Sequence, residues 1–356
     1  MIVGIDAYFL FERYNTGIGT LTSNIIKALS VLDKENTYIL FTPKINHHNV
    51  ANEILKNKNF KIIEYKGCFS KYRRLWLQNP GLIYKIINEK VDIFWGGGEY
   101  IPLLLPKKIR CVVSIHDVVY VLFPDTIKFT DRVLYHTLFP LCVRKSDAII
   151  TVSNTSKEEI IAYLKPEKPI FVAYNGIYLD RYTSNIKNMK ENFILFVGTI
   201  QPRKNLINMI KAFELIAKEV DCSLVIVGAS GWKNSDIKKL IDVMDPKITE
   251  KIQFMGYVDN DALIELYTKA QVFVAPSLHE GFGLIILEAL ASGTPVVTSI
   301  RGAIPEVFGD SVLYADPMNP EDIKDKVIDI IKNAKKKNEM SEYGLQYAKP
   351  VSYTHL

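Results

Sequence analysis

The segment Glu280-Gly281-Phe282-Gly283-Leu284-Ile285-Ile286-Leu287-Glu288 joins a glycine-containing loop to the start of an apolar helix. The β-branched run Val272 to Ala275 precedes it, so we expect a strand, a loop and then a helix that begins near Gly283. Free backbone N–H groups at such a helix start attract anions, and the two glycines let phosphate or sugar approach the backbone closely. The segment therefore predicts an α/β fold with a diphosphate-binding loop.

Two carboxylates seven residues apart bracket this turn. Glu280 lies on the loop, and Glu288 falls on the expected helix, about one and a half turns in. Each has an alternative interpretation that involves no ligand. Glu280 could be an ordinary loop charge, and Glu288 a solvated helix position.

Outward from this segment, short β-branched runs alternate with amphipathic stretches along the whole chain, which is typical of βαβ units and a parallel sheet. The pattern pauses at residues 175–191, which are polar, and restarts at Phe193, so we expect one domain over residues 1–176 and a second over 177–356. The expected strands are Ile2 to Asp6, Tyr38 to Thr42, Lys61 to Tyr65, Val91 to Trp95, Cys111 to His116, Ala148 to Ser153, Ile170 to Tyr174, Phe193 to Val197, Ser223 to Val227, Ile252 to Phe254, Val272 to Ala275 and Val296 to Thr298.

Length and composition suit two soluble domains. The chain has 356 residues, of which 48% are hydrophobic and 23% charged. The start, Met1 to Asp6, has no signal-peptide pattern, and no apolar stretch approaches the roughly 20 residues that cross a bilayer. The four cysteines, at positions 68, 111, 142 and 222, have no paired spacing that would suggest zinc or disulfides. We therefore expect a cytoplasmic protein.

Charge is distributed unevenly along the chain. Through Gly176 there are 23 Lys and Arg against 16 Asp and Glu, or +7, and the remainder has 21 against 23, or −2. The cations are spread over several elements without a nucleic-acid recognition motif, so we expect an anionic membrane surface or a phosphorylated acceptor and no nucleic acid. The run from Tyr72 to Trp76 mixes cations with aromatic residues. It is either an amphipathic helix with its aromatics in the core or an interfacial membrane contact.

The segment from Glu280 to Val297 closely resembles the paired-glutamate signature of the retaining glycosyltransferases of family four. Further segments of that family occur in order along nearly the whole chain: Gly17-Ile18-Gly19, Ile115-His116-Asp117, Thr151-Val152-Ser153, Tyr174-Asn175-Gly176, Val197-Gly198-Thr199, Pro202-Arg203-Lys204-Asn205 and Ile304-Pro305-Glu306-Val307. The resemblance implies the GT-B fold, in which two Rossmann-like, doubly wound domains face an interdomain cleft that holds the active site. The first domain would bind the acceptor and the second the nucleotide sugar.

The resemblance also implies roles for individual residues. Glu288 would accept hydrogen bonds from the ribose hydroxyls, and Glu280 would lie beside the transferred sugar. Arg203 and Lys204 would neutralise the diphosphate as charge grows on the leaving group. His116 would contact the donor sugar or its phosphate. The remaining donor contacts would come from the backbone or side chains of Gly17, Gly19, Gly281, Phe282, Gly283, Leu284, Tyr257 and Val258.

Several of these residues also allow readings without a substrate. A lone histidine at a strand end is often structural, the Arg203–Lys204 turn could simply be solvated, and the glycines at 17 and 19 could serve packing. Many family members carry an arginine where this chain has Thr199, so either Arg203 and Lys204 would bear the phosphate charge alone or another cation would substitute. The run Asp259-Asn260-Asp261 mimics a metal-binding aspartate pair, but it precedes a helical run and reads as a helix cap.

The resemblance implies a metal-independent, retaining transfer by front-face substitution, with no cofactor and with GDP-mannose as the favoured donor ahead of UDP-hexoses. The acceptor would be a glycan or a lipid-linked sugar, which places the protein at the inner face of the membrane. Two alternatives are a nucleotide-sugar epimerase of the same fold and a non-catalytic nucleotide-sugar-binding protein. The final residues, from about Pro350 to Leu356, break off a helical run and read as non-native sequence.

Overall fold

The computed structural model describes residues 1–11, 17–45, 48–127, 129–183, 190–229, 231 and 235–351. It divides into two compact units. The first holds the residues up to Leu122 and those from Phe129 to Gly176, and the second takes in a short segment from Phe123 and the residues from Ile177 onward. Residues 352–356, most of the tail predicted to be non-native, lie outside the described residues.

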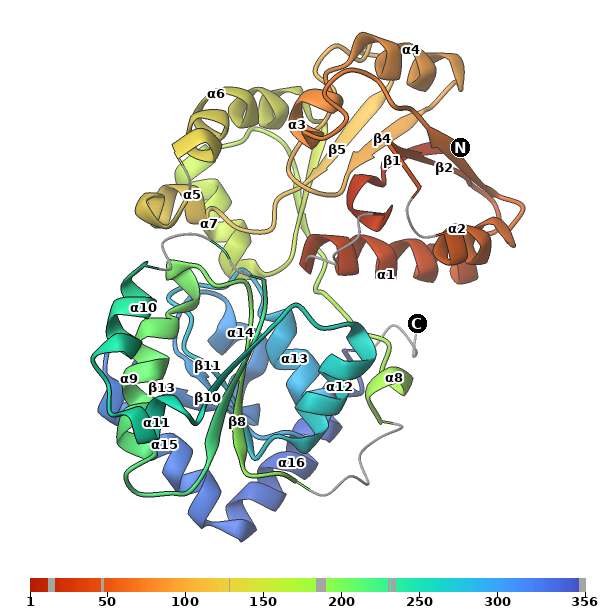
Figure 1. Ribbon diagram of the computed structural model, residues 1–356. Coiled ribbons are helices and arrows are strands. Elements are labelled where there is room, and N and C mark those ends of the chain that lie inside the picture. Colours follow the sequence, from red (N-terminus) through yellow and green to blue (C-terminus); the bar gives the residue numbers. More distant parts are fainter. Residues whose placement is uncertain are drawn as a thin grey trace. The chain divides into compact units, whose positions relative to one another are not determined.

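The first unit is built on a seven-stranded sheet of order β3-β2-β1-β4-β5-β6-β7, and every described strand pair in it is parallel (Figure 1). Its strands are β1 Ile2–Asp6, β2 Thr37–Thr42, β3 Phe60–Glu64, β4 Ile93–Gly96, β5 Arg110–Ser114, β6 Ala148–Thr151 and β7 Ile170–Val172. Its helices are η1 Tyr8–Phe11, α1 Gly17–Leu32, α2 His48–Leu55, α3 Arg73–Trp76, α4 Pro80–Asn88, α5 Val119–Leu122, α6 Phe129–Lys145 and α7 Asn154–Leu164.

The second unit has a six-stranded sheet of order β10-β9-β8-β11-β12-β13, again with parallel pairs. The strands are β8 Phe193–Val197, β9 Ser223–Val227, β10 Ile252–Gly256, β11 Val272–Ala275, β12 Val296–Ser299 and β13 Leu313–Ala315. The helices are η2 Pro124–Thr126, α8 Asp180–Thr183, η3 Pro202–Lys204, α9 Leu206–Ile216, α10 Ser235–Asp242, α11 Pro246–Thr249, α12 Asn260–Lys269, α13 Leu284–Ala291, α14 Ile304–Phe308, η4 Gly309–Ser311, α15 Pro320–Lys332 and α16 Ala334–Ala348.

The central strands of both sheets are apolar because helices cover both of their faces. In β8 all five residues are buried, as they are in β11, β12 and most of β9. Helices α9 and α15 pack together, and α12, α13 and α16 form a second packed group (Figure 1). Phe213 of α9 is fully buried in a core cluster that α9 shares with α15 and the strands of the sheet. The sequence thus predicts two doubly wound α/β sheets correctly.

Each sheet reverses its strand order at one point. The chain winds outward from β1 through β2 to β3 and then returns to the other side of β1 with β4, and β8 and β11 stand in the same relation. Ligands of open α/β sheets bind outside the carboxyl ends of the strands at such a switch point. The residues that follow β1 and β4, and those that follow β8 and β11, are therefore the positions where a ligand is expected.

Each expected strand agrees with the structure to within two residues at both ends, but two details differ. The strand expected to end at His116 ends at Ser114, so His116 lies in the loop after β5. The edge strand β13 was not predicted, because three residues are too few for a periodic pattern to show. The reading of Asp259 as a helix cap is confirmed, since its carboxylate accepts the Ala262 N–H of α12 at 2.9 Å.

Candidate active site

Glu280 is the centre of a buried ion-pair cluster in the second unit. Its Oε1 lies 2.5 Å from Lys204 Nζ, and its Oε2 lies 3.0 Å from Arg203 NH1. The side chains of these residues are only 10–15% exposed. The interpretations of Glu280 as an ordinary loop charge and of Arg203–Lys204 as a solvated turn are therefore wrong.

The electrostatics of the cluster follow from this geometry. Burial alone would raise the pKa of Glu280, but Lys204 and Arg203, together with a hydrogen bond from Ser277, hold the pKa of this carboxyl well below its usual range. Glu280 is consequently an anion at all physiological pH values. The two cations stay charged beside it and can attract further negative charge.

Backbone hydrogen bonds fix the two loops that carry the cluster. Arg203 lies after β8 and Glu280 after β11, so both stand at the switch point of the second sheet. The Leu278 N–H donates to the Arg203 carbonyl at 2.8 Å, and Arg203 NH1 donates to the His279 carbonyl at 2.6 Å. The loops therefore hold each other in register.

Two residues to which the sequence assigned no role shape these loops. Asn205 adopts a left-handed conformation with φ +59°, and its Nδ2 donates to the Pro276 and Pro317 carbonyls at 3.0 and 2.6 Å. Gly302, with φ +61°, packs so tightly that a Cβ would lie 2.4 Å from the Glu280 carbonyl oxygen. A side chain at position 302 would displace the Glu280 backbone.

The predicted anion-binding loop has the expected form. Helix α13 begins at Leu284, and Gly283 is its N-cap residue with φ +95° and no side-chain cap. A Cβ on Gly283 would lie 3.0 Å from the Phe308 ring, so both conformation and space require glycine. The loop residues Glu280, Gly281 and Phe282 that lead into it are buried. The start of α13 thus follows directly on the Glu280 cluster.

Glu288 is buried inside the second unit, which excludes the solvated helix position considered above. The Tyr267 hydroxyl donates to Glu288 Oε2 at 3.2 Å, and the Tyr182 hydroxyl forms a second hydrogen bond to the carboxyl. Burial raises the pKa of Glu288 to about 7, although both tyrosines and Arg181 favour the ionised form. This carboxyl can therefore gain or lose its proton near neutral pH. Neither tyrosine could be assigned to it from sequence spacing.

The predicted base-binding edge lies after β10, the edge strand of the second sheet. Tyr257 and Val258 follow Gly256, which has φ +67° at a register shift between β10 and β9. Tyr257 is 42% exposed. The structure brings neither residue into the Glu280 cluster.

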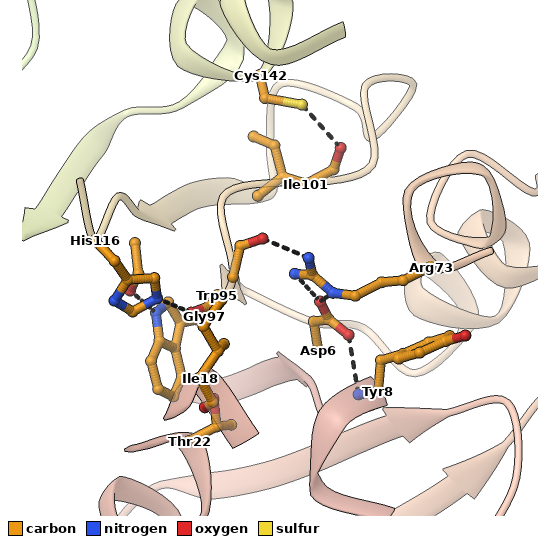
Figure 2. Close-up of polar contacts among 12 residues, drawn as sticks. Asp6, Tyr8, Ile18, Thr22, Arg73, Trp95, Gly97, Ile101, His116 and Cys142 are labelled. Atoms are coloured by element: carbon orange, nitrogen blue, oxygen red, sulfur yellow. Dashed lines mark hydrogen bonds and ion pairs between the residues drawn. The ribbon is translucent and has the colours of Figure 1, made fainter. Parts of the chain in front are cut away.

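The remaining predicted residues, His116, Gly17 and Gly19, belong to the first unit. The His116 Nε2 lies 2.9 Å from the Gly97 carbonyl oxygen, which ties the loop after β5 to the loop after β4 (Figure 2). Burial lowers the pKa of His116, although Gly97 and Asp117 favour the charged ring. Gly17 begins α1, and among the described residues no atom lies within 4 Å of a Cβ placed there. Packing against described residues thus does not require glycine at position 17, whereas Gly19 is buried.

The run from Tyr72 to Trp76 forms the short helix α3 with one of its two aromatic residues in the core, and its contact with a membrane stays a prediction. Trp76 and Arg73 are buried, as expected for an amphipathic helix. Tyr72 is 66% exposed and Leu75 40%. Among the described residues, no group of three or more His, Cys, Asp or Glu side chains is placed to hold a metal ion.

Comparisons with known proteins place this architecture in a class. The solved structures that resemble it include sucrose-phosphate synthase from Thermosynechococcus elongatus, with a TM-score of 0.77, 16% identity and coverage of 100% of this chain and 96% of the other. The HepE protein of Anabaena in complex with UDP-glucose superimposes with a TM-score of 0.71 and 16% identity, over 99% and 96% of the two chains. The fold is therefore the GT-B fold of two Rossmann-like domains.

Sequence comparison identifies the family. Residues 16–181 match the profile described as Glycosyltransferase Family 4, and residues 182–347 match Glycosyl transferases group 1. The O-antigen chain mannosyltransferase B of Escherichia coli is 27% identical over 374 residues, which cover 95% of this chain and 93% of the relative. The chain belongs to the family-four glycosyltransferases and is a transferase.

The raised pKa of Glu288 predicts a pH-dependent stability difference. A carboxyl whose pKa is higher in the folded state stabilises fully below its unfolded value of 4.5, and this contribution is lost as pH rises through about 7. The shift corresponds to on the order of 3 kcal/mol. Replacing Glu288 with Gln should therefore raise the urea unfolding midpoint relative to the native protein more at pH 8 than at pH 5. The Glu250→Gln variant, at an exposed position, is the control. A Glu288→Gln difference that does not change with pH would contradict the assignment.

Proposed function

We propose that this transferase moves a mannosyl group from GDP-mannose to a hydroxyl of a glycan or lipid-linked acceptor, with retention of configuration and without a metal. The observation that carries the proposal is the buried cluster of Glu280, Arg203 and Lys204 at the switch point of the second sheet. The name of the Escherichia coli relative supports mannose as the sugar. The UDP-glucose bound by the HepE protein supports a nucleotide-sugar donor of this general kind.

The cluster supplies positive charge where a diphosphate leaving group needs it. Lys204 and Arg203 are held beside the uncapped start of α13, whose backbone N–H groups also favour an anion. As the bond between the sugar C1 and the phosphate oxygen breaks, negative charge accumulates on that oxygen, and fixed cations stabilise this state more than the ground state. In this proposal the two cations take the part that a divalent metal takes elsewhere.

Retention fits a front-face substitution. The acceptor oxygen attacks C1 on the side from which the diphosphate departs, and the acceptor proton passes to the departing phosphate oxygen, so that the products are the glycoside and GDP. Glu280 would lie beside the sugar and stabilise positive charge on its ring. Retaining glycosidases instead place two carboxyl groups about 5 Å apart across the bond, one of them as nucleophile.

Donor screening tests this proposal directly. Because a ligand that binds only the folded state stabilises it, GDP-mannose should raise the melting temperature more than UDP- or ADP-hexoses do. The shift and the release of GDP should persist with EDTA in excess. Turnover that EDTA abolishes and Mn²⁺ restores would contradict the metal-independent mechanism. Conversion of the donor to an isomeric nucleotide sugar without acceptor would indicate an epimerase, and binding of the donor with no turnover under any condition would indicate a sensor.

Substitutions of the two glutamates should change different kinetic parameters. Glu288, assigned to the ribose, would bind ground and transition states alike, so Glu288→Gln should mainly raise the donor KM. Glu280 would act where charge develops in the transition state, so Glu280→Gln should mainly lower kcat without raising the KM. Steady-state kinetics at varied donor concentration separates the two effects. The reverse pattern would exchange the roles, and two fully active variants would remove both glutamates from the mechanism.

A membrane-bound acceptor requires the protein to reach a membrane surface. No helix among the described residues is long and apolar enough to cross one. Near α3 of the first unit, Phe69, Tyr72 and Leu75 are 61%, 66% and 40% exposed, and the first 176 residues carry the excess of positive charge. We propose that this segment docks on anionic lipid through its aromatic and basic side chains.

Vesicle sedimentation tests the membrane contact. At low salt the protein should sediment with phosphatidylglycerol vesicles and not with phosphatidylcholine vesicles, because each cation near an anionic surface contributes about 1 kcal/mol. The double variant Phe69→Ser and Tyr72→Ser should reduce the sedimented fraction. Equal recovery with both lipids would disprove the contact.

A further inference from the structure

The loop that begins at the last residue of β4 contains three successive glycines and lies at the switch point of the first sheet. It runs through Gly96, Gly97 and Gly98 to Glu99, which is 8% exposed and has φ +75°. Glycines restrict the backbone least, so the conformation of such a loop depends on contacts from outside it. The structure supplies these contacts from β5, from His116 and from α3.

Two of the contacts join this loop to the end of β5 and to the loop that follows it. The Glu99 N–H donates to the Ser114 carbonyl at 2.9 Å, and His116 Nε2 lies 2.9 Å from the Gly97 oxygen. A carbonyl oxygen only accepts, so Nε2 carries the ring proton, and Nδ1 is the acceptor nitrogen of the neutral ring. The position of the Gly97 carbonyl therefore sets the tautomer and the orientation of His116.

The third contact comes from a buried arginine on α3. Arg73 NH1 donates to the Gly98 carbonyl, the neighbour of the carbonyl that His116 contacts (Figure 2). The guanidinium is itself fixed by Asp6, the last residue of β1, whose Oδ2 lies 2.7 Å from Nε and 2.5 Å from NH2. A Cβ on Gly98 would lie 2.9 Å from Arg73 NH2, so the loop and the guanidinium are in close contact.

We infer that Arg73 is a positioning residue that, through the glycine loop, holds the His116 ring in a single tautomer and orientation for the transfer reaction. Asp6 fixes Arg73, Arg73 fixes Gly98, and the adjacent Gly97 carbonyl fixes His116. That the ring orientation serves the reaction rests on the proposed function, namely on the donor contact of His116. That Arg73 orients the ring does not depend on the proposed function.

A lysine cannot replace this arginine. The planar guanidinium donates to the carboxylate and to the carbonyl at the same time from nitrogens in a fixed geometry, whereas an ammonium is a compact point charge on a flexible stem. Arg73→Lys keeps the positive charge beside Asp6 and removes the second contact. The neighbouring Arg74 offers a matched control, because it pairs with Asp131 at 2.6 Å and lies over the Tyr135 ring.

Nitrogen-15 NMR of the histidine rings in the free protein tests the inference, with the His116 signals assigned from a His116→Gln variant. In the native protein His116 should show one Nε2–H tautomer and should titrate below 6.5, since burial and Arg73 lower the pKa while Gly97 and Asp117 raise it. In Arg73→Lys the ring shifts should become those of a tautomer mixture, and the titration midpoint should fall, because the Gly97 contact that raises the pKa is loosened while the positive charge at position 73 is kept. Arg74→Lys should leave both unchanged.

A second variant, in the glycine loop, tests the same contact between Arg73 and Gly98. In Gly98→Ala the new methyl group displaces the guanidinium, so the His116 signals should change as in Arg73→Lys while the amide spectrum of the second unit stays native. Hydrolysis of GDP-mannose by water gives the kinetic readout, in which kcat should fall about tenfold and the donor KM should stay within about twofold.

The outcomes separate the inference from the proposed function. His116 shifts and titration that match the native protein in both folded variants would overturn the positioning role, whatever the turnover. Changed shifts with native turnover would show that Arg73 orients the ring but that the orientation does not serve the reaction. A native protein that neither binds nor hydrolyses GDP-mannose would contradict the proposed donor and leave the ring measurement valid.

Discussion

The second unit depends on one interaction, the burial of the Glu280 carboxylate between Lys204 and Arg203. Removing the Glu280 carboxylate would leave two cations without their partner, at a cost of about 3–5 kcal/mol. The cluster therefore lowers the stability of the fold unless all three side chains are held in contact. Asn205 in its left-handed conformation, the close approach of Gly302 and the hydrogen bond between Leu278 and Arg203 supply that constraint.

Both units place an ion pair at the same position in their sheets. In the second, a cation after β8 pairs with a carboxylate after β11, and in the first, Asp6 at the end of β1 pairs with an arginine that holds the loop after β4. In each case the ion pair stands where the strand order reverses and where open sheets bind ligands. The second cluster can act on a ligand directly, whereas the first acts on His116 through a glycine loop.

The sequence predicts the elements and the main site segment well, because β-branched runs and a glycine loop before an apolar helix are local patterns. Periodicity locates β8 and β11, and the order of the motifs leads to Glu280, Arg203 and Lys204. Contacts across the fold leave no such pattern. Nothing in the spacing joins Tyr182 and Tyr267 to Glu288, or Gly302 to Glu280, and the short strand β13 is too brief to detect.

Burial was the property that the sequence described least well. A glutamate on a helix and a basic turn both look solvated in isolation. Here Glu288 is buried beside Tyr267 and Tyr182, and the Arg203 and Lys204 side chains are only 15% and 12% exposed beside Glu280. His116 was expected at a strand end, but it lies two residues beyond and takes its orientation from Gly97. These differences arise from tertiary packing, and they decide which residues carry perturbed pKa values.

Calorimetric titration of GDP and UDP into the native protein, Lys204→Ala and Glu280→Gln, with EDTA present, tests the central claim most directly. If the diphosphate binds the two cations that Glu280 neutralises, Lys204→Ala should weaken binding of the preferred nucleotide at least about tenfold, as the loss of a charge-assisted hydrogen bond of about 1.5–3 kcal/mol requires. Glu280→Gln should bind that nucleotide as tightly as the native protein or more tightly, because the competing carboxylate is gone. Equal affinities of the native protein and Lys204→Ala for both nucleotides would contradict the account.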